Sequence, residues 1–317
     1  MRRFLLRRVA AVPATLLGVS LMVFLATDVL PGDVARTVLG REASAESVAA
    51  LRHELGLDQP VYLRYLHWLA DFGTGSWGTS YTLHVPVRDL VLDRLGQSLM
   101  LASLAFALLV PVALTLGVLA GLGEDTPVDW VISGVSLALG ATPEFVTGVV
   151  LLVVFSVELG WLPASAQTSP GDGPLVVLAH LALPATCLVL LCTGYVARHV
   201  RASTVLVVAS PYVRAARLRG VRGARLVRRH VLRNATVPAA SALGVQLQFL
   251  LGGLLVVELL FNYPGIGALL LASATAKDLP TLQATAMVLG VAYLAVVLLA
   301  DIAYRLLDPR VRLDGEG

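Results

Sequence analysis

Six long apolar stretches alternate with polar ones along the 317-residue chain. One helical crossing of a bilayer needs about 20 apolar residues, and each stretch reaches roughly that length. Lipid offers the backbone no hydrogen-bond partners, and a β-barrel would alternate over shorter segments, so the pattern predicts transmembrane helices. The predicted spans are 9–30, 98–122, 130–157, 174–195, 237–261 and 284–307.

The longest polar stretch is 31–97, which carries six arginines and eight acids. Within it, Val48, Leu51 and Leu55 recur at helical spacing, and Gly56 follows as a stop signal. This spacing predicts a short amphipathic helix that ends at Gly56. No internal repeat and no separate soluble domain is expected.

The basic residues gather at the two ends of the chain and in one long connection. Four arginines lie in 1–8, ten lie in 196–236 without any acid, and three lie near the C-terminus. Because Lys and Arg favour the cytoplasmic side, both termini, including the tail 308–317, are expected there. The stretch 31–97 is then external, and the short connection 123–129 is cytoplasmic. This last connection is acidic instead, with Glu124, Asp125 and Asp129.

The composition agrees with the pattern and excludes a soluble globular domain. The chain is 57% hydrophobic and 14% charged, with a mean hydropathy of +0.79, whereas soluble domains are roughly 45–50% apolar and about 25% charged. Cys187 and Cys192 lie in the fourth span and are expected to pack as small hydrophobes. The sequence has no metal-ligand spacing and no Gly-x-x-x-x-Gly-Lys-Ser/Thr run, so we expect no metal site and no ATP site.

Two acids stand out inside the predicted spans. Pro143 breaks the third span at 141–144, and Glu144 follows it; Glu258 lies in the fifth span. Ionisable groups at membrane depth are candidates for function. Pro143, Glu144 and Glu258 are therefore candidates for the transport pathway, although the acids could instead pair with neighbours and serve helix packing.

The basic connection 196–236 contains its own helix signals. Ser210 is a good N-cap residue, Pro211 suits the first helical position, and Gly220 is a natural C-terminal stop. These signals predict a short helix from Pro211 to Gly220, about nine residues long. The positive charge of this connection could be explained by membrane orientation and attraction to anionic lipid alone. The charge therefore does not show that the helix docks on a protein.

The composition of one face of this helix favours contact with a protein. At helical spacing, one aromatic residue, two small residues and one arginine share this face: Tyr212, Ala215, Ala216 and Arg219. Arg214 and Arg217 lie to one side. A lipid-bound helix would present large apolar residues, whereas a face of this kind can enter a groove closely.

The segment 212–220, followed by 230–235 and Pro238, resembles the cytoplasmic coupling motif of permease subunits from ABC importers. The branch is the one that handles dipeptides, oligopeptides and nickel. Further stretches with the same resemblance occur in order along nearly the whole chain: 30–33, 55–60, Arg64-Tyr65, 160–165, 263–267 and 308–310. The chain is most similar to the subunit with the long first external loop.

The resemblance implies an all-α polytopic fold of the ABC importer type I permease class, with six transmembrane helices and both termini cytoplasmic. The expected parts are an arm and first span (1–30), an external region (31–97), a five-span core (98–307) and the tail (308–317). The connection 196–236 would then carry the coupling helix.

The resemblance also implies that this helix docks into a cleft on a separate ATPase subunit. The implied coupling residues are Ser210, Tyr212, Val213, Arg214, Ala215, Ala216, Arg217, Arg219 and Gly220. The sequence departs from the family at two points. Ser210 stands where an acid is usual, and 123–129 is acidic where basic residues are common.

The expected function is half of a translocation pathway for peptides in the bacterial cytoplasmic (inner) membrane, without catalysis by this chain. The implied partners are a second homologous permease, two ATPase subunits that bind ATP and Mg²⁺, and an extracytoplasmic substrate-binding protein. Nickel or another small solute is the alternative cargo.

Two other classes of protein fit less well. An ion-coupled secondary transporter would use Glu144, Glu258 and Asp301 as ion sites, but the inverted repeats common in such proteins are not visible. An intramembrane hydrolase would use His180 or His199, but no catalytic motif organises them.

Overall fold

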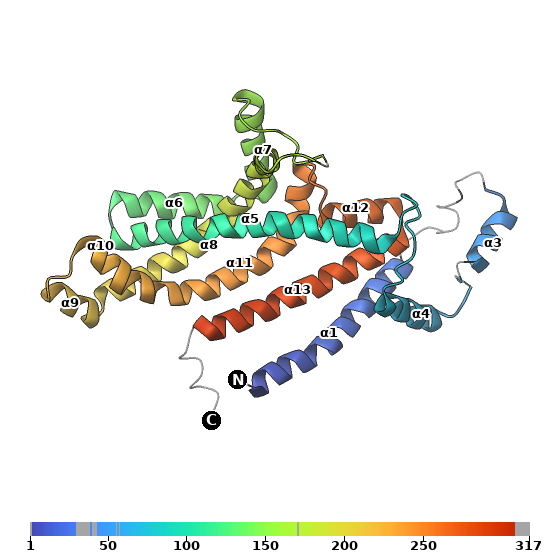
Figure 1. The fold of residues 1–317 in the computed structure, drawn as a ribbon, viewed down its shortest axis with the longest axis horizontal. Helices are drawn as coiled ribbons and strands as arrows, with labels where there is room; N and C mark the ends of the chain where they lie inside the picture. Colours follow the sequence, from blue (N-terminus) through green and yellow to red (C-terminus); the bar gives the residue numbers. More distant parts are fainter. Residues whose placement is uncertain are drawn as a thin grey trace. The chain divides into compact units, whose positions relative to one another are not determined.

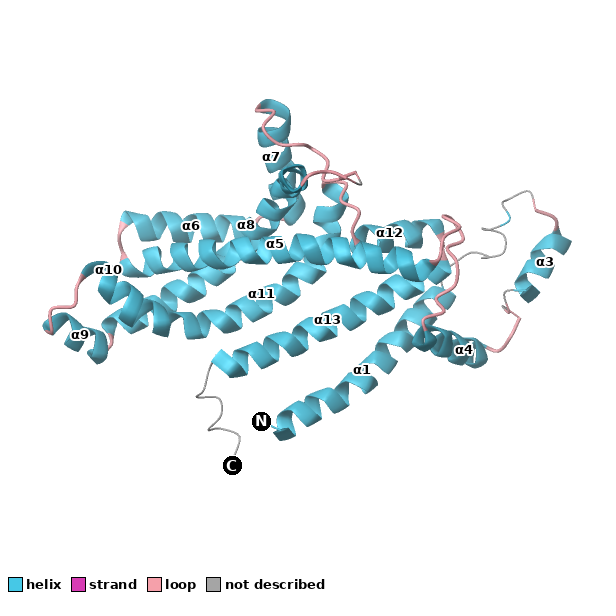
Figure 2. Ribbon diagram, in the orientation of Figure 1, coloured by secondary structure: helices cyan, strands magenta, loops and turns pink. Residues whose placement is uncertain are grey.

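The structure, a computed structural model, describes residues 2–29, 39, 43–54, 56, 58–169 and 171–307. The similarity stretches 30–33 and 308–310 and the tail 308–317 lie outside the described residues, as do parts of 31–42. Within the described part, helices dominate and the only extended pairing is an isolated bridge between Thr79 and Pro86. The prediction of an all-α fold is confirmed there (Figure 2).

The chain divides into two compact units, each assembled from segments that are distant in sequence. Unit 1 comprises Met1–Ser98 and Pro264–Ala295, and unit 2 comprises Leu99–Tyr263 and Val296–Gly317. Two long helices, α5 (Val87–Leu122) and α13 (Leu279–Leu307), contribute residues to both units.

Unit 1 contains α1 (Arg2–Val29), α3 (Ala45–Glu54), α4 (Val61–Thr74) and α12 (Ile266–Ala276). The predicted short helix before Gly56 is confirmed as α3, and Gly56 has the left-handed φ of 65° expected at a helix end. α4 was not predicted, because Arg64, His67 and Asp71 interrupt its apolar residues. Its aromatic side packs on α1, where the rings of Phe24 and Tyr65 lie 5.5 Å apart.

The connection between α12 and α13 is tied to the segment before α5. The Asp278 carboxylate accepts hydrogen bonds from Ser80 Oγ at 2.5 Å, the Tyr81 backbone N–H at 3.1 Å, Thr82 Oγ1 at 3.0 Å and Thr281 Oγ1 at 2.9 Å. One buried carboxylate thus joins residues almost 200 positions apart in the chain.

Unit 2 is built around α8 (Pro174–Ala209), which packs against α6 (Pro127–Ala141), α7 (Glu144–Leu152) and α11 (Leu232–Leu260) (Figure 1). A π-helical stretch, Val153–Glu158, continues α7. Two short helices, α9 (Pro211–Leu218) and α10 (Gly223–Leu226), connect α8 to α11 through the π-helical stretch Val227–Val231. Cys187 and Cys192 are buried free thiols in the core of this unit.

Three described helices are long and apolar enough to cross a membrane: Val87–Leu122, Pro174–Ala209 and Leu279–Ile302. Two bent pairs raise this number to five if each pair is one span. The first pair, α6 and α7, bends by 106° at the predicted break beside Pro143. The second bends by 48° within α11. The apolar part of α1, Ala11–Thr27, is shorter, so six spans stay a prediction.

Several helices continue beyond the apolar stretches that define the predicted spans. α5 begins at Val87 rather than 98, and α13 begins at Leu279 rather than 284. α8 continues past 195 to Ala209. A change from apolar to polar residues marks where a bilayer would end, whereas a backbone helix stops only at a capping or breaking residue. The stretch 196–236 is accordingly mostly helical.

Candidate functional site

The short helix α9 begins and ends at the predicted signals. Ser210 Oγ accepts a hydrogen bond from the Val213 N–H at 3.4 Å, and Pro211 is the first helical residue. At the other end, Gly220 has a φ of 84°. The Val221 N–H donates to Ala216 O at 3.1 Å and the Gly220 N–H donates to Arg217 O at 3.0 Å. This is the Schellman arrangement that ends many helices.

The inner face of α9 packs on its own chain. Val213 and Ala216 are fully buried and form a small core with Leu226, against which Val207 and Val221 also pack. Ala216 was expected on the docking face with Tyr212 and Ala215, and the structure corrects this assignment. The helical spacing of the residues places Ala216 between the exposed and the buried face of α9. Its packing against Leu226 puts it on the buried face.

Tyr212 holds α9 to the following helical stretch. Its hydroxyl donates a hydrogen bond to the His230 backbone carbonyl, and the two rings lie 5.5 Å apart. Tyr212 is 39% exposed, so only part of its ring is available to a partner. The other exposed residues of α9 and its C-terminal cap are Pro211, Arg214, Ala215, Arg217, Leu218 and Arg219.

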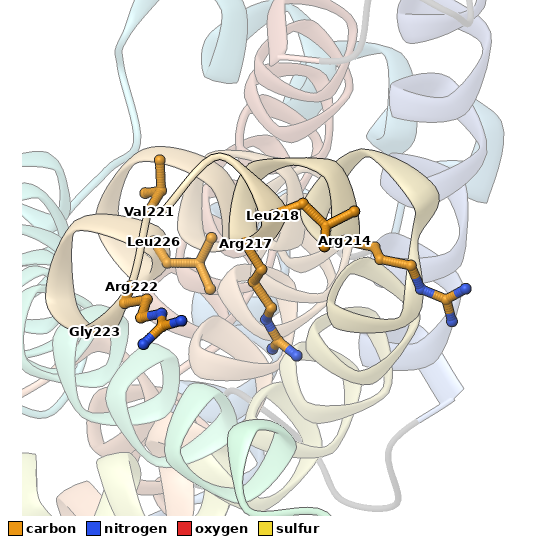
Figure 3. Close-up of a pocket in the computed structure, with 7 residues that line it drawn as sticks. All are labelled: Arg214, Arg217, Leu218, Val221, Arg222, Gly223 and Leu226. Atoms are coloured by element: carbon orange, nitrogen blue, oxygen red, sulfur yellow. The ribbon is translucent and has the colours of Figure 1, made fainter.

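A cavity of about 550 Å³ opens between α9 and α10. Its lining residues are Arg214, Arg217, Leu218, Val221, Arg222, Gly223 and Leu226. Figure 3 shows Leu226 between the side chains of Arg222 and Arg217, with Leu218 beside Arg214. The cavity therefore combines an apolar surface with three guanidinium groups.

The acidic connection 123–129 is bound to Arg201 in the C-terminal part of α8. Asp129 accepts two hydrogen bonds from Arg201, from Nε at 2.5 Å and from Nη2 at 2.6 Å, and its side chain is 2% exposed. The Asp125 N–H and the Ser133 hydroxyl add two further hydrogen bonds at 3.1 Å. This ion pair was not predicted, although an acidic connection on the same predicted side as ten arginines is a signal for one.

Close backbone approach holds α5 against the same part of α8. A Cβ atom at Gly121 would lie 2.8 Å from Arg201 O and 2.6 Å from Thr204 Cβ. No residue larger than glycine fits there without separating the helices. Together with the Asp129–Arg201 pair, this contact joins α5 and α6 to the end of α8 that carries α9.

The candidate pathway residues have different environments. Pro143 is the exposed N-cap residue of α7, and Glu144 begins this helix with a half-buried side chain. Glu258 in α11 is fully buried, and its backbone carbonyl accepts a hydrogen bond from the Tyr263 N–H at 2.7 Å. A role in the pathway or in packing stays a prediction for all three residues.

The two histidines considered for a hydrolase lie at different parts of α8. His180 Nδ1 is 2.6 Å from Ser165 O, and His199 Nδ1 is 2.9 Å from Tyr195 O. They are 19 positions apart in one helix, roughly 28 Å at 1.5 Å per residue, so they cannot share one site. Among the described residues, no group of three or more His, Cys, Asp or Glu side chains could hold a metal ion.

The chain matches two family descriptions that together cover nearly all of it. Residues 113–313 match "Binding-protein-dependent transport system inner membrane component", and residues 1–102 match the N-terminal part of such membrane components. A solved structure of an amino acid ABC transporter is similar in fold, with a TM-score of 0.50 and 19% identity. The similarity covers 70% of this chain and 94% of that one.

The relatives are similar over their full length. A putative peptide transport system permease protein of Brucella abortus is 37% identical over 314 residues, which are 99% of this chain and 100% of the relative. The glutathione transport system permease protein GsiC of Escherichia coli K12 is 34% identical over 312 residues, 98% of this chain and 99% of the relative. The chain therefore belongs to the family of binding-protein-dependent transport system inner membrane components, as a permease subunit of an ABC importer.

Proposed function

We propose that this permease forms half of a translocation pathway for peptides in the bacterial cytoplasmic membrane. In this proposal it crosses the membrane six times with both termini in the cytoplasm, beside a second homologous permease subunit. Two ATPase subunits bind ATP and Mg²⁺, and an extracytoplasmic binding protein delivers the cargo. The names of the relatives, which concern peptides and glutathione, support the substrate class.

The observation that carries the coupling role is the construction of α9. The helix is capped at both ends, packed by Val213 and Ala216 on its own chain, and surrounded by arginines on its outer side. A helix that is anchored inward and exposed outward can transmit force from a docked partner. Ser210, Tyr212, Val213, Ala216 and Gly220 then position the helix.

In this proposal, transport depends on contacts between α9 and the ATPase that change with bound ATP. The ATP-bound and ATP-free forms of the ATPase dimer would contact α9 differently, and a partner can shift an equilibrium only by such a difference. Movement of α9 would pass into α8, to which α5 and α6 are joined by Gly121 and Asp129. The pathway between the two permease subunits would thereby alternate between outward and inward states.

The coupling role is tested by placing a bulky side chain on the exposed side of α9. Ala215→Trp should lower both the ATPase subunits retained by the purified permease and the ATP turnover stimulated by loaded binding protein. Ala70→Trp, at an exposed alanine of α4, is the control of equal size. Unchanged ATPase retention and ATP turnover in Ala215→Trp would contradict the coupling role.

The substrate is tested on the binding protein that delivers cargo to this permease. Calorimetric titration with peptides and with nickel chelates should show saturable binding of peptides. Binding of the nickel chelates alone would contradict the peptide proposal and favour the alternative cargo.

A further inference from the structure

The cavity between α9 and α10 has an apolar surface that its own chain leaves uncovered. Leu218 is 84% exposed, although it lies beyond the end of α8 in a strongly basic part of the chain. Leu226 and Val221 form the opposite side of the same cavity and already pack on the core of α9. Leu218 therefore stands at the mouth of a hollow with apolar side chains behind it.

The charges around this apolar surface all have one sign. Arg214, Arg217 and Arg222 line the cavity, and no acid lines it. Among the described residues, the ion pair of this basic region joins Asp129 to Arg201, and no ion pair uses Arg214, Arg217 or Arg222. A surface with three cations around an apolar centre is complementary to an apolar side chain flanked by carboxylates.

A protein partner fits this surface better than a lipid surface does. Helices that bind membranes present a broad face of large apolar residues, whereas the exposed side of α9 has a single large aliphatic residue, Leu218, among arginines and Ala215. Guanidinium groups also form paired hydrogen bonds with carboxylates in a fixed geometry. A protein partner that presents carboxylates around an apolar side chain would use both the apolar surface and the guanidinium groups.

We propose that this cavity receives an apolar side chain flanked by carboxylates on the ATPase subunit, with Leu218 as the central contact and Arg217 and Arg222 as its charged edge. This inference rests on the proposed coupling function and names the chemistry of the partner. It also explains how docking works with Ser210 at the position where an acid is usual, because positive rather than negative groups of α9 provide the charge complementarity.

The charged edge can be tested by cross-linking, because the chain contains a single lysine, Lys277. A carbodiimide joins a lysine amine to a carboxylate as an amide and leaves guanidinium groups unreacted. In the assembled transporter, Arg217→Lys and Arg222→Lys should each yield a permease–ATPase product. The control is Arg228→Lys, at an exposed arginine that does not line the cavity, which should yield much less.

The apolar centre is tested with Leu218→Ala, which should reduce ATPase retention at least about tenfold, as loss of a central interface residue does. Its thermal unfolding should stay unchanged because Leu218 is exposed. Leu175→Ala, at an 81% exposed leucine at the other end of α8, should retain the ATPase normally.

Three results would overturn the inference. In the first, Leu218→Ala retains as much ATPase as the unaltered chain, and neither lysine variant cross-links more than Arg228→Lys. The proposed contact chemistry is then wrong, whereas the coupling function stands. If Leu218→Ala instead lowers only the phosphatidylglycerol that co-purifies with the chain, the surface binds lipid. If the unaltered chain retains no ATPase at all, the coupling function itself fails.

Discussion

At the scale of single residues, two buried carboxylates connect distant parts of the chain. Asp129 binds Arg201, and Asp278 binds the segment 80–82. A buried carboxylate without its partners is costly, so each of these acids constrains the segments around it. Neither was among the residues expected to carry function, yet Asp129 is bound to the helix that precedes α9, and Asp278 holds the segment before α5.

Removal of the Asp129 carboxylate should destabilise unit 2. Asp129→Ala leaves the partly buried Arg201 guanidinium without its ion pair, and breaking a buried pair costs about 3 kcal/mol. Thermal unfolding in detergent should shift down accordingly. Glu124→Gln removes an exposed negative charge from the same connection and should leave the unfolding temperature unchanged. Equal unfolding temperatures for the two variants would contradict the role of the pair.

Asp278 should make the segment 79–86 sensitive to acid. Burial raises the pKa of this carboxyl, but hydrogen bonds from Ser80, the Tyr81 N–H, Thr281 and Thr82 outweigh burial and lower its pKa below the ordinary 3.8. A lowered pKa stabilises the folded state at pH values above 3.8, and this stabilisation is lost as the pH falls through the folded pKa.

Hydrogen exchange measures this effect. The amides of residues 79–85 should be protected at pH 6 and should lose protection below the ordinary aspartate pKa. In Asp278→Asn the protection should already be reduced at pH 6, with little further loss on acidification. An unaltered acid response in Asp278→Asn would show that another group is responsible.

At the scale of elements, the end of α8 is the joint between the core of unit 2 and α9. α5 approaches it at Gly121, α6 is bound to it through Asp129, and α9 packs on it through Val213 and Ala216. Such packing transmits displacement because side chains in a dense interior have no free space to absorb it. The proposed coupling therefore depends on contacts that never touch the ATPase.

A methyl group at Gly121 should separate α5 from α8. The added Cβ would lie 2.6 Å from Thr204 Cβ and 2.8 Å from Arg201 O, and overpacking of this kind typically costs about 1–3 kcal/mol. Gly121→Ala should lower both the unfolding temperature and the ATP turnover stimulated by binding protein. The matched control is Gly134→Ala in α6, where no atom lies within 4 Å of the new Cβ. Normal turnover in Gly121→Ala would argue against transmission through this joint.

At the scale of the whole molecule, the family and the arginine distribution together define the orientation that we propose. Seventeen arginines lie in the three regions expected on the cytoplasmic side, four in 1–8, ten in 196–236 and three at the end. The basic residues set the orientation of a membrane protein more strongly than the acids do, so the acidic connection 123–129 does not reverse it.

Reporter fusions test this orientation. Green fluorescent protein fused after residue 317 should fluoresce, because it folds in the cytoplasm. Alkaline phosphatase should be active when fused after residue 83 or 171, and inactive when fused after 125 or 222. An active phosphatase at 222 would place α9 outside and would remove the basis of the coupling proposal.

The sequence by itself determined the features that depend on neighbouring residues. Ser210, Pro211 and Gly220 set the ends of α9, and Pro143 set the break between α6 and α7. The apolar stretches marked the candidate spans. Caps and prolines act on adjacent turns of a helix, and an apolar stretch is read directly along the chain. The family resemblance added the coupling role, and the comparisons confirm the family.

Tertiary structure decided what depends on residues far apart in the chain. It extended α5, α8 and α13 beyond the apolar stretches. It paired Asp129 with Arg201 across 72 residues. It turned Ala216 inward against Leu226 and left Leu218 exposed above the cavity. Spacing on one helix cannot choose between two neighbouring faces, because the choice depends on which distant side chains arrive to cover one of them.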